Sequence, residues 1–438
     1  MIILLKVVLP KNEYWGSGVE KADNEAIVDF KIHVSDGELT DLKNRLVNSR
    51  IGHTTLEDVK SFEYGVNTKA LLDIKNYWLN KYDWKKQEAM LNAFPQFKTQ
   101  IEGLNIHYIH AKPPKNKYTT VYPLLMVHGW PGSVLEFYKL IPMLTDPATV
   151  DPKIDFAFEL IVPSLPGYGF SDSSKKSGLN QLVTARIFKK LLSRLGHGKA
   201  FVAGTDWGSL VVSNLARFWP EHCKGLHITM AFVQPSTPKQ WFYTIAGNIA
   251  PSLVFKNPLH HNYSTKRLFM NVMKESGYMH IQATKPDTVG VSLNDSPLGL
   301  AAYILEKFST WTDPRFVDLE DGGLTKYFTM DELLTNVMIY WTQGNIVNSQ
   351  RYYKEHFRDQ DSMEASKMFI NVPTGYAAFP HDIGERLPEE IFQLSFNMLT
   401  YNDFKGHEGG HFAAFQAPKL VALDVINFVK QVIYFPRN

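Results

Sequence analysis

A short glycine-flanked motif places an aspartate where an enzyme nucleophile could stand. Residues 204–209 read Gly-Thr-Asp-Trp-Gly-Ser, with Asp206 at the centre, directly after a predicted strand and at the start of a predicted helix. This is the spacing of a nucleophile elbow, in which small flanking residues permit a sharp turn that exposes the central side chain at the top of a sheet. The motif therefore predicts that Asp206 attacks a substrate.

An aspartate nucleophile limits the substrates that can react. A serine that attacked a saturated carbon would leave an ether, which water cannot easily cleave, whereas an aspartate leaves an alkyl ester whose carbonyl a histidine-activated water can attack. Asp206 therefore indicates substrates that react at a saturated carbon, such as epoxides or alkyl halides, rather than esters or peptides.

A second glycine-rich turn, His128-Gly129-Trp130-Pro131-Gly132, follows an earlier predicted strand. In hydrolases with such an elbow, one backbone N–H of the oxyanion hole comes from this strand-to-helix loop and the other from the residue after the nucleophile. We therefore expect Trp130 and Trp207 to donate these N–H groups. The alternative is that both turns only bend the chain, and their order after two predicted strands argues against it.

A histidine and an acid complete the expected set downstream. His411 lies in the glycine-rich sequence 409–412, and the order nucleophile, acid, histidine is that of α/β-hydrolases. Asp382 follows the predicted strand 369–373 and is the expected partner that orients the imidazole. Its competitors, which by default would be solvated surface charges, are Glu385, Glu389, Glu390 and Glu408.

Two tyrosines are candidates for the proton donor that an epoxide needs. The ring oxygen of an epoxide gains negative charge as its bond to carbon breaks, whereas a departing halide needs N–H groups around it. Tyr278 lies within 276–282, and Tyr353 lies within 350–354. Because the chain has 20 tyrosines, each could instead be a packing residue, and the pattern does not separate Tyr353 from its neighbour Tyr352.

The elements that must position these groups alternate between strand and helix. Strands are predicted at 106–110, 121–128, 158–163, 200–203, 225–230 and 369–373. Helices are predicted at 36–46, 68–79, 133–144, 184–195, 209–219 and 420–435. From residue 121 to residue 230 the predicted strands and helices alternate, which is typical of an α/β fold with a mostly parallel sheet and helices on both faces.

The chain between two parts of this sheet domain has a different character. Residues 234–366 are rich in aromatic residues and methionine, are helical in period and contain no clear strand. We expect them to form a helical lid inserted between core segments 99–233 and 367–438. Residues 1–98 are expected to form a helical and extended segment that packs around the lid.

Composition narrows the class of protein. Of 438 residues, 44% are hydrophobic and 21% are charged, as in a compact enzyme. A net charge of +2 gives no field that would collect nucleic acid. The single cysteine, Cys223, cannot form an intramolecular disulfide and is expected to be buried rather than reactive. The sequence shows no ligand cluster that would predict a metal or an organic cofactor.

Four stretches resemble the microsomal epoxide hydrolase family, which includes insect juvenile hormone epoxide hydrolases: 128–133, 204–209, 277–312 and 409–415. The resemblance extends over nearly the whole chain, from Asp29 onward. It implies an α/β-hydrolase fold with a helical lid and an N-terminal segment packed around it. It also implies roles for four side chains: the nucleophile Asp206, the general base His411, and the epoxide-oxygen donors Tyr278 and Tyr353.

This sequence departs from the family in two places. Asp382 stands where the mammalian members carry a glutamate, and an aspartate has a shorter reach to His411. The family's N-terminal membrane anchor is not evident, because residues 1–10 are apolar except for Lys6 but too few to span a bilayer. The expectation is therefore a truncated chain or a soluble variant, whereas the resemblance implies association with the endoplasmic reticulum membrane.

These observations predict an epoxide hydrolase that converts an apolar epoxide and water to a vicinal diol through a covalent Asp206 ester. An aromatic content of 13% suits a lipophilic substrate, and both a juvenile hormone and a xenobiotic epoxide fit that description. The alternatives are a haloalkane dehalogenase on the same fold and a non-catalytic, hydrolase-like ligand-binding protein.

Overall fold

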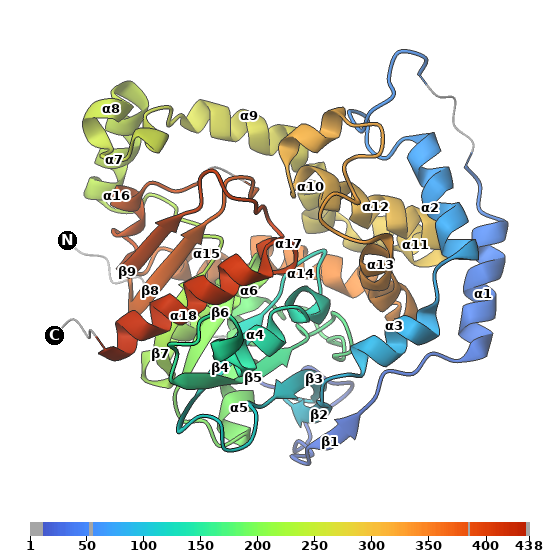
Figure 1. The fold of residues 1–438 in the computed structure, drawn as a ribbon, viewed down its shortest axis with the longest axis horizontal. Coiled ribbons are helices and arrows are strands. Elements are labelled where there is room, and N and C mark those ends of the chain that lie inside the picture. The colour runs from blue at the N-terminus through green and yellow to red at the C-terminus, as the bar shows by residue number, and fades with distance from the viewer. Residues whose placement is uncertain (1–11, 52–55, 384–385, 435–438) are drawn as a thin grey trace.

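A computed structural model describes residues 12–51, 56–383 and 386–434 (Figure 1). Within these residues the central feature is a nine-stranded sheet in the order β1-β2-β3-β5-β4-β6-β7-β8-β9. Its strands are β1 Val28–Phe30, β2 Gln96–Ile101, β3 Leu104–Ala111, β4 Thr120–Val127, β5 Phe156–Pro163, β6 Ala200–Gly204, β7 Cys223–Ile228, β8 Ile370–Ala378 and β9 Phe396–Asp403.

Most of the sheet is parallel, as predicted. Every neighbouring pair from β5 through β4, β6, β7 and β8 to β9 is parallel, whereas β1, β2 and β3 add to β5 in antiparallel fashion. Glu102 and Gly103 join β2 to β3 with φ values of 54° and 79°, which suit a tight two-residue hairpin turn. The carboxyl ends of the parallel strands lie at one edge, where α/β folds bind ligands.

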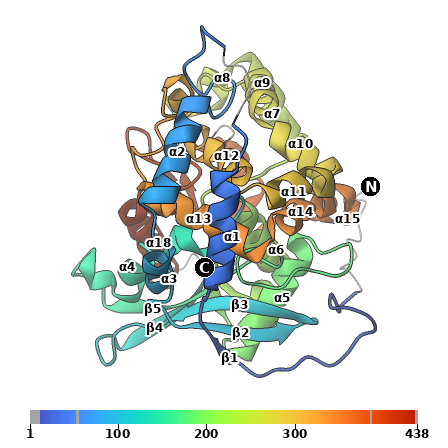
Figure 2. The same cartoon turned by 90° about the vertical axis from the view of Figure 1, so that its right-hand side faces the viewer.

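Helices cover both faces of the sheet. Figures 1 and 2 show α4 and α18 on one face and α5 and α6 on the other. The helices of the sheet domain, on both faces together, are α4 Ile141–Thr145, α5 Gln181–Arg194, α6 Trp207–Phe218, α16 Glu389–Phe392, α17 Ala413–Gln416 and α18 Pro418–Tyr434. Short 3-10 turns connect them: η1 Val134–Phe137, η2 Pro147–Thr149 and η3 Pro220–His222.

A helical segment is inserted between β7 and β8, and residues 229–369, all of which are described, contain no strand. Its helices are α7 Pro238–Ile249, α8 Pro251–Val254, α9 Thr265–Glu275, α10 Gly277–Thr284, α11 Pro286–Asp295, α12 Pro297–Thr310, α13 Met330–Gln343, α14 Ile346–Arg358 and α15 Gln360–Ala365, with 3-10 turns η4 Pro258–His260 and η5 Pro314–Asp318. Most of these helices lie above the sheet in Figure 1.

The N-terminal segment contacts both the inserted helices and the sheet. Its helices are α1 Asp36–Val47, α2 Thr68–Asn80 and α3 Trp84–Leu91, and they pack against α12 and α13. Strand β2 begins within this segment and continues past residue 98, its predicted end, so the segment also extends the sheet. The Trp15 indole N–H donates to Glu102 at 2.9 Å, and the same buried carboxylate accepts from Arg186 at 2.8 Å. Buried polar bonds thus tie residues near the N-terminus to α5.

The structure corrects the sequence prediction in several places. The helix predicted at 133–144 is instead two short elements, η1 and α4, because Pro142 has no N–H with which to continue a helix through the preceding turn. Strands β1, β2 and β9 and helices α3, α16 and α17 were not predicted. Cys223 is 2% exposed, as expected. Residues 1–10 and Phe435, which the predictions included, lie outside the described residues. None of the helices in the described ranges is long and apolar enough to span a membrane.

Candidate active site

Asp206 sits at a sharp turn between β6 and α6. Its backbone has φ 48° and ψ −126°, a conformation that side-chain-bearing residues rarely adopt. The turn requires glycine on both sides: a Cβ on Gly208 would lie 1.9 Å from the Val127 carbonyl oxygen, and one on Gly204 would lie 2.4 Å from the Gly208 backbone. The predicted elbow is therefore present, and it holds the Asp206 side chain at the carboxyl end of β6.

Two backbone N–H groups favour the charged form of the Asp206 carboxylate. The Trp130 N–H donates to Asp206 Oδ1 at 2.7 Å, and the adjacent Trp207 N–H also lowers the pKa of the carboxyl group. A Cβ on Gly129 would lie 2.1 Å from Asp206 Oδ1, so this residue must be glycine for the loop to approach so closely. Preorganised donors of this kind can stabilise negative charge that develops on an oxygen at this position.

His411 lies between two carboxylates. Its Nδ1 is 2.7 Å from Asp382 Oδ1, and its Nε2 is 3.5 Å from Asp206 Oδ2. Asp382 follows β8 and His411 follows β9, so these neighbouring parallel strands bring the two residues together. The His411 backbone N–H donates to the Trp311 backbone carbonyl at 2.8 Å, and the imidazole and indole rings of these residues pack edge to face. Aspartate is therefore long enough to reach the histidine.

The competing acids lie elsewhere. Glu408 and Glu389 are exposed, and the buried Glu390 accepts a hydrogen bond from the Lys256 N–H at 2.9 Å. Glu385 lies outside the described residues. Of the acids that the structure describes, Asp382 is the one that hydrogen-bonds the His411 ring.

Burial and charge shift the pKa values of this cluster. Burial alone would lower the pKa of His411, but the charge and hydrogen bond of Asp382, together with the charges of Asp206 and Glu136, raise it to about 9. Burial also raises the pKa of Asp206, while the His411 charge and the two backbone N–H groups oppose that rise. The neighbouring carboxylates Asp382 and Asp206 thus favour the protonated form of the His411 ring more than burial disfavours it.

Tyr278 and Tyr353 pack against the two tryptophans, Trp130 and Trp207, that flank Asp206. The Tyr278 ring stacks on Trp130 with centroids 5.1 Å apart, and the Tyr353 ring meets Trp207 edge to face at 4.7 Å. The two tyrosine rings lie 5.8 Å from each other. Burial, reinforced by the Asp206 charge, raises the pKa of both phenols, so each stays protonated and able to donate.

Tyr352 and Tyr353 point to different neighbours. The Tyr352 hydroxyl donates to Thr184 Oγ1 on α5 at 2.8 Å. No described residue lies at hydrogen-bonding distance and angle from the buried Tyr353 hydroxyl. The structure therefore leaves Tyr353, rather than Tyr352, with a hydroxyl available near Asp206.

Sequence reasoning missed one buried acid in this cluster. Glu136 on η1 is 3% exposed, and its Oε2 atom has no hydrogen-bond partner among the described residues. Burial raises its pKa to about 8; the His411 charge opposes this rise and the Asp206 charge adds to it. The available signal was that Glu136 is the one acidic residue in the largely apolar stretch 121–138.

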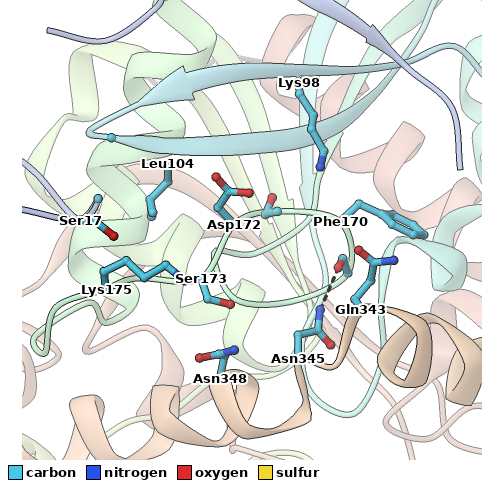
Figure 3. Close-up of a pocket in the computed structure, with 14 residues that line it drawn as sticks. Ser17, Lys98, Leu104, Phe170, Asp172, Ser173, Lys175, Gln343, Asn345 and Asn348 are labelled. Atoms are coloured by element: carbon cyan, nitrogen blue, oxygen red, sulfur yellow. Dashed lines mark hydrogen bonds between the residues drawn. The ribbon is translucent and has the colours of Figure 1, made fainter. Parts of the chain in front are cut away.

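Two other polar groupings lie apart from this cluster. A hollow of about 520 Å³ is lined mainly by polar residues, among them Lys98, Asp172 and Asn345 (Figure 3), and none of the catalytic candidates lines it. His110, Glu159 and His197 place one possible metal-ligand atom each within 4.8 Å of one another. There, however, the Lys112 ammonium lies 3.4 Å from the Glu159 carboxylate and already supplies positive charge.

The mostly parallel sheet, the aspartate at the elbow and the hydrogen-bonded acid–histidine pair define an α/β-hydrolase. Comparison with known families agrees with this class: "Epoxide hydrolase N terminus" matches residues 27–137, and "alpha/beta hydrolase fold" matches residues 122–254.

Comparison with individual proteins narrows the class to a family. The chain is 48% identical to "Epoxide hydrolase 1" of Oryctolagus cuniculus, covering 95% of this chain and 92% of the relative. It is 41% identical to "Juvenile hormone epoxide hydrolase 1" of Ctenocephalides felis, covering 98% and 91%. The crystal structure of the juvenile hormone epoxide hydrolase of the silkworm Bombyx mori matches with a TM-score of 0.91 and 39% identity, covering 97% and 99%. The chain belongs to the epoxide hydrolase family, which confirms the predicted family and fold.

Proposed function

We propose that this epoxide hydrolase opens a lipophilic epoxide through a covalent ester on Asp206 and releases a vicinal diol. One observation carries the proposal. The Asp206 carboxylate is held by the Trp130 N–H at 2.7 Å and lies 3.5 Å from the His411 imidazole, which in turn is bound to Asp382. The buried cluster thus contains a nucleophile, a base and charge-stabilising donors.

In the first step, Asp206 attacks one ring carbon of the epoxide. Its Oδ2 forms the new bond to carbon, because Oδ1 is held by the Trp130 N–H. The carbon–oxygen bond of the ring breaks, and its electron pair goes to the ring oxygen. Tyr278 or Tyr353 donates a proton to that oxygen, which becomes a hydroxyl group of the product.

In the second step, water cleaves the ester. Ester formation removes the negative charge of Asp206, one of the charges that raise the pKa of His411. The proton that His411 then releases restores the tyrosine phenol. Neutral His411, oriented by Asp382, removes a proton from water, and the resulting hydroxide attacks the ester carbonyl. The Trp130 and Trp207 N–H groups stabilise the tetrahedral oxyanion. As this intermediate collapses, the bond between the carbonyl carbon and the substrate oxygen breaks, and that oxygen takes the proton that the attacking hydroxide carried. The diol leaves, Asp206 is a carboxylate again, and His411 keeps the proton it took from water.

Residues 234–366 serve as the lid in this proposal, since they supply both proton-donating tyrosines from α10 and α14. The aromatic rings around Asp206 favour an apolar substrate. Relatives named juvenile hormone epoxide hydrolases support a terpenoid epoxide as one such substrate. Measurement of kcat/KM for a panel of terpenoid and aryl epoxides shows which of these two substrate classes the enzyme prefers.

The proposal predicts that both tyrosine hydroxyls speed the first step. Tyr278→Phe and Tyr353→Phe should each slow ester formation, and the double variant should lose about 10²–10⁴-fold, because no acid then protonates the leaving oxygen. Rapid-quench single turnovers with an epoxide measure this rate. Tyr352→Phe is the matched control, since its hydroxyl is bonded to Thr184. Wild-type rates in both single variants and the double variant would assign these tyrosines to packing.

The proposal also predicts the pH dependence of a Glu136→Gln variant. Above its raised pKa of about 8, Glu136 carries a negative charge that helps to raise the pKa of His411, so removal of Glu136 lowers the His411 pKa. Ester hydrolysis requires neutral His411 and should therefore begin at a lower pH than in the wild type. The pH profile of single-turnover ester hydrolysis measures the shift, with the exposed Glu408→Gln as control. An unchanged profile, or the same shift in the control, would contradict this role for Glu136.

We also infer association with the endoplasmic reticulum membrane from the resemblance to the microsomal family. The 48% identity to a mammalian epoxide hydrolase 1 supports this location.

A further inference from the structure

The inserted helices carry large apolar side chains that lie on the surface. On α7, Phe242, Ile245 and Ile249 are 62%, 55% and 79% exposed, and their spacing places them on one face of the helix. Leu253 on α8 is 87% exposed, and Phe269 on α9 is 61% exposed. Exposed apolar groups this concentrated mark an interaction surface rather than ordinary surface variation. We call these five residues the apolar face.

Within residues 231–274 the side-chain charge is of one sign; the acids beside this segment are Glu275, the last residue of α9, and the exposed Glu389 on α16, which packs against α7. Residues 231–274 contain no aspartate or glutamate, and their cationic residues are Lys239, Lys256, Lys266, Arg267 and Lys274. The whole chain, by contrast, is almost neutral, with a net charge of +2. Apolar side chains flanked by Lys and Arg without acids are the composition of helices that lie in the interface of an anionic bilayer.

The position of this surface suits a membrane contact. Figures 1 and 2 show α7, α8 and α9 together at an outer edge of the molecule, away from the antiparallel strands β1 and β2. Helix α9 ends at Glu275 and α10 begins at Gly277, next to Tyr278 of the active site. A lipophilic epoxide dissolved in a bilayer would therefore meet this surface close to the helix that carries a proton donor.

We propose that α7–α9 dock on an anionic lipid bilayer, with the apolar face buried at the boundary between headgroups and acyl chains and the lysines against lipid phosphates and carboxylates. This inference rests on the membrane association proposed above and names the surface responsible for it. It does not depend on the catalytic mechanism.

Co-sedimentation of the full chain with vesicles tests the surface. The probes are phosphatidylcholine vesicles with and without 30% phosphatidylserine, a fraction of about one third chosen to give the negative surface potential of a cytoplasmic leaflet. The variant Ile249→Ser/Leu253→Ser/Phe269→Ser should lose about tenfold or more of the partition coefficient. The matched control Val19→Ser/Tyr64→Ser/Val291→Ser removes apolar groups that are 78%, 76% and 68% exposed elsewhere, and should bind as the wild type does. Lys266→Gln/Lys274→Gln should weaken binding to the anionic vesicles alone.

Several outcomes would overturn the proposal. The wild type could bind neither kind of vesicle. The apolar-face variant could bind as strongly as the wild type. The control variant could lose as much binding as the apolar-face variant. A concentration-dependent dimer in analytical ultracentrifugation that the apolar-face variant abolishes, without any vesicle binding, would assign the surface to a second copy of the chain. Hydrolysis of a water-soluble epoxide without vesicles is measured in parallel. The apolar-face variant should retain it, so failure of the catalytic proposal is separable from failure of this one.

Discussion

A single turnover in ¹⁸O-water, with enzyme in excess over epoxide, should give unlabelled diol and an Asp206 carboxylate that carries the label. Asp206 transfers one of its own oxygens to the substrate, and solvent oxygen replaces it when water attacks the ester carbonyl. The 3.5 Å separation of His411 Nε2 and Asp206 Oδ2 places the base beside that carbonyl. Mass spectrometry of the diol and of the peptide that contains Asp206 locates the label.

Direct attack on the epoxide by a water that His411 activates would instead put ¹⁸O into the diol at the first turnover, and fully labelled diol would exclude the ester mechanism. Asp206→Ala should lower kcat by a factor on the order of 10⁴ or more, as removal of a nucleophile does in other covalent hydrolases. Asp206→Asn is the poorer variant, because slow self-deamidation can restore the acid.

Asp382→Asn should accumulate the Asp206 ester. The first step needs no activated water and should continue, whereas hydrolysis should slow by about 10²–10⁴-fold, because a neutral amide neither orients the His411 ring in the same way nor stabilises its positive charge. The 2.7 Å bond between Asp382 Oδ1 and His411 Nδ1 is the contact that would be changed. Rapid-quench mass spectrometry detects the ester as a mass increase equal to that of the epoxide.

Glu408→Gln is the control for this experiment, since Glu408 was a competing acid in the sequence and is exposed in the structure. Full activity in Asp382→Asn combined with ester accumulation in Glu408→Gln would reverse the assignment of the acid. The pKa of His411 gives a second readout. Loss of the Asp382 charge should lower that pKa from about 9, which is measurable by NMR titration of the imidazole in the free enzyme.

Local signals explain which parts of the site could be predicted from the sequence. The elbow at Asp206 is encoded within six residues, and glycine at 204 and 208 is required by atoms in the same turn and in β4. Helix α1 begins at a Ser35–Glu38 capping box, so its start is also visible locally. Features that depend on neighbouring residues alone were therefore predicted well.

Features that depend on distant packing were not. Strand β9 has mostly half-exposed side chains, so its sequence lacks the apolar run of a buried strand. Tyr352 and Tyr353 are adjacent on α14, and only the packing of α14 against α5 shows which hydroxyl is engaged by Thr184. Glu136 looks like an ordinary helix-surface charge until η1 is placed beneath the catalytic cluster.

The order of the catalytic residues along the chain has a consequence for biosynthesis. The proposed nucleophile, oxyanion donors and proton-donating tyrosines are synthesised before residue 354, whereas Asp382 and His411 follow in the last segment. A partly made chain that could form the ester without hydrolysing it would be inactivated by its first substrate. In the finished fold, Tyr278 packs on Trp311 with ring centroids 4.9 Å apart, and Trp311 packs on His411 at 5.0 Å. His411 thus joins an aromatic cluster whose other members, Tyr278 and Trp311, precede residue 354, so the proposed base and its acid are the last parts of the site to be synthesised.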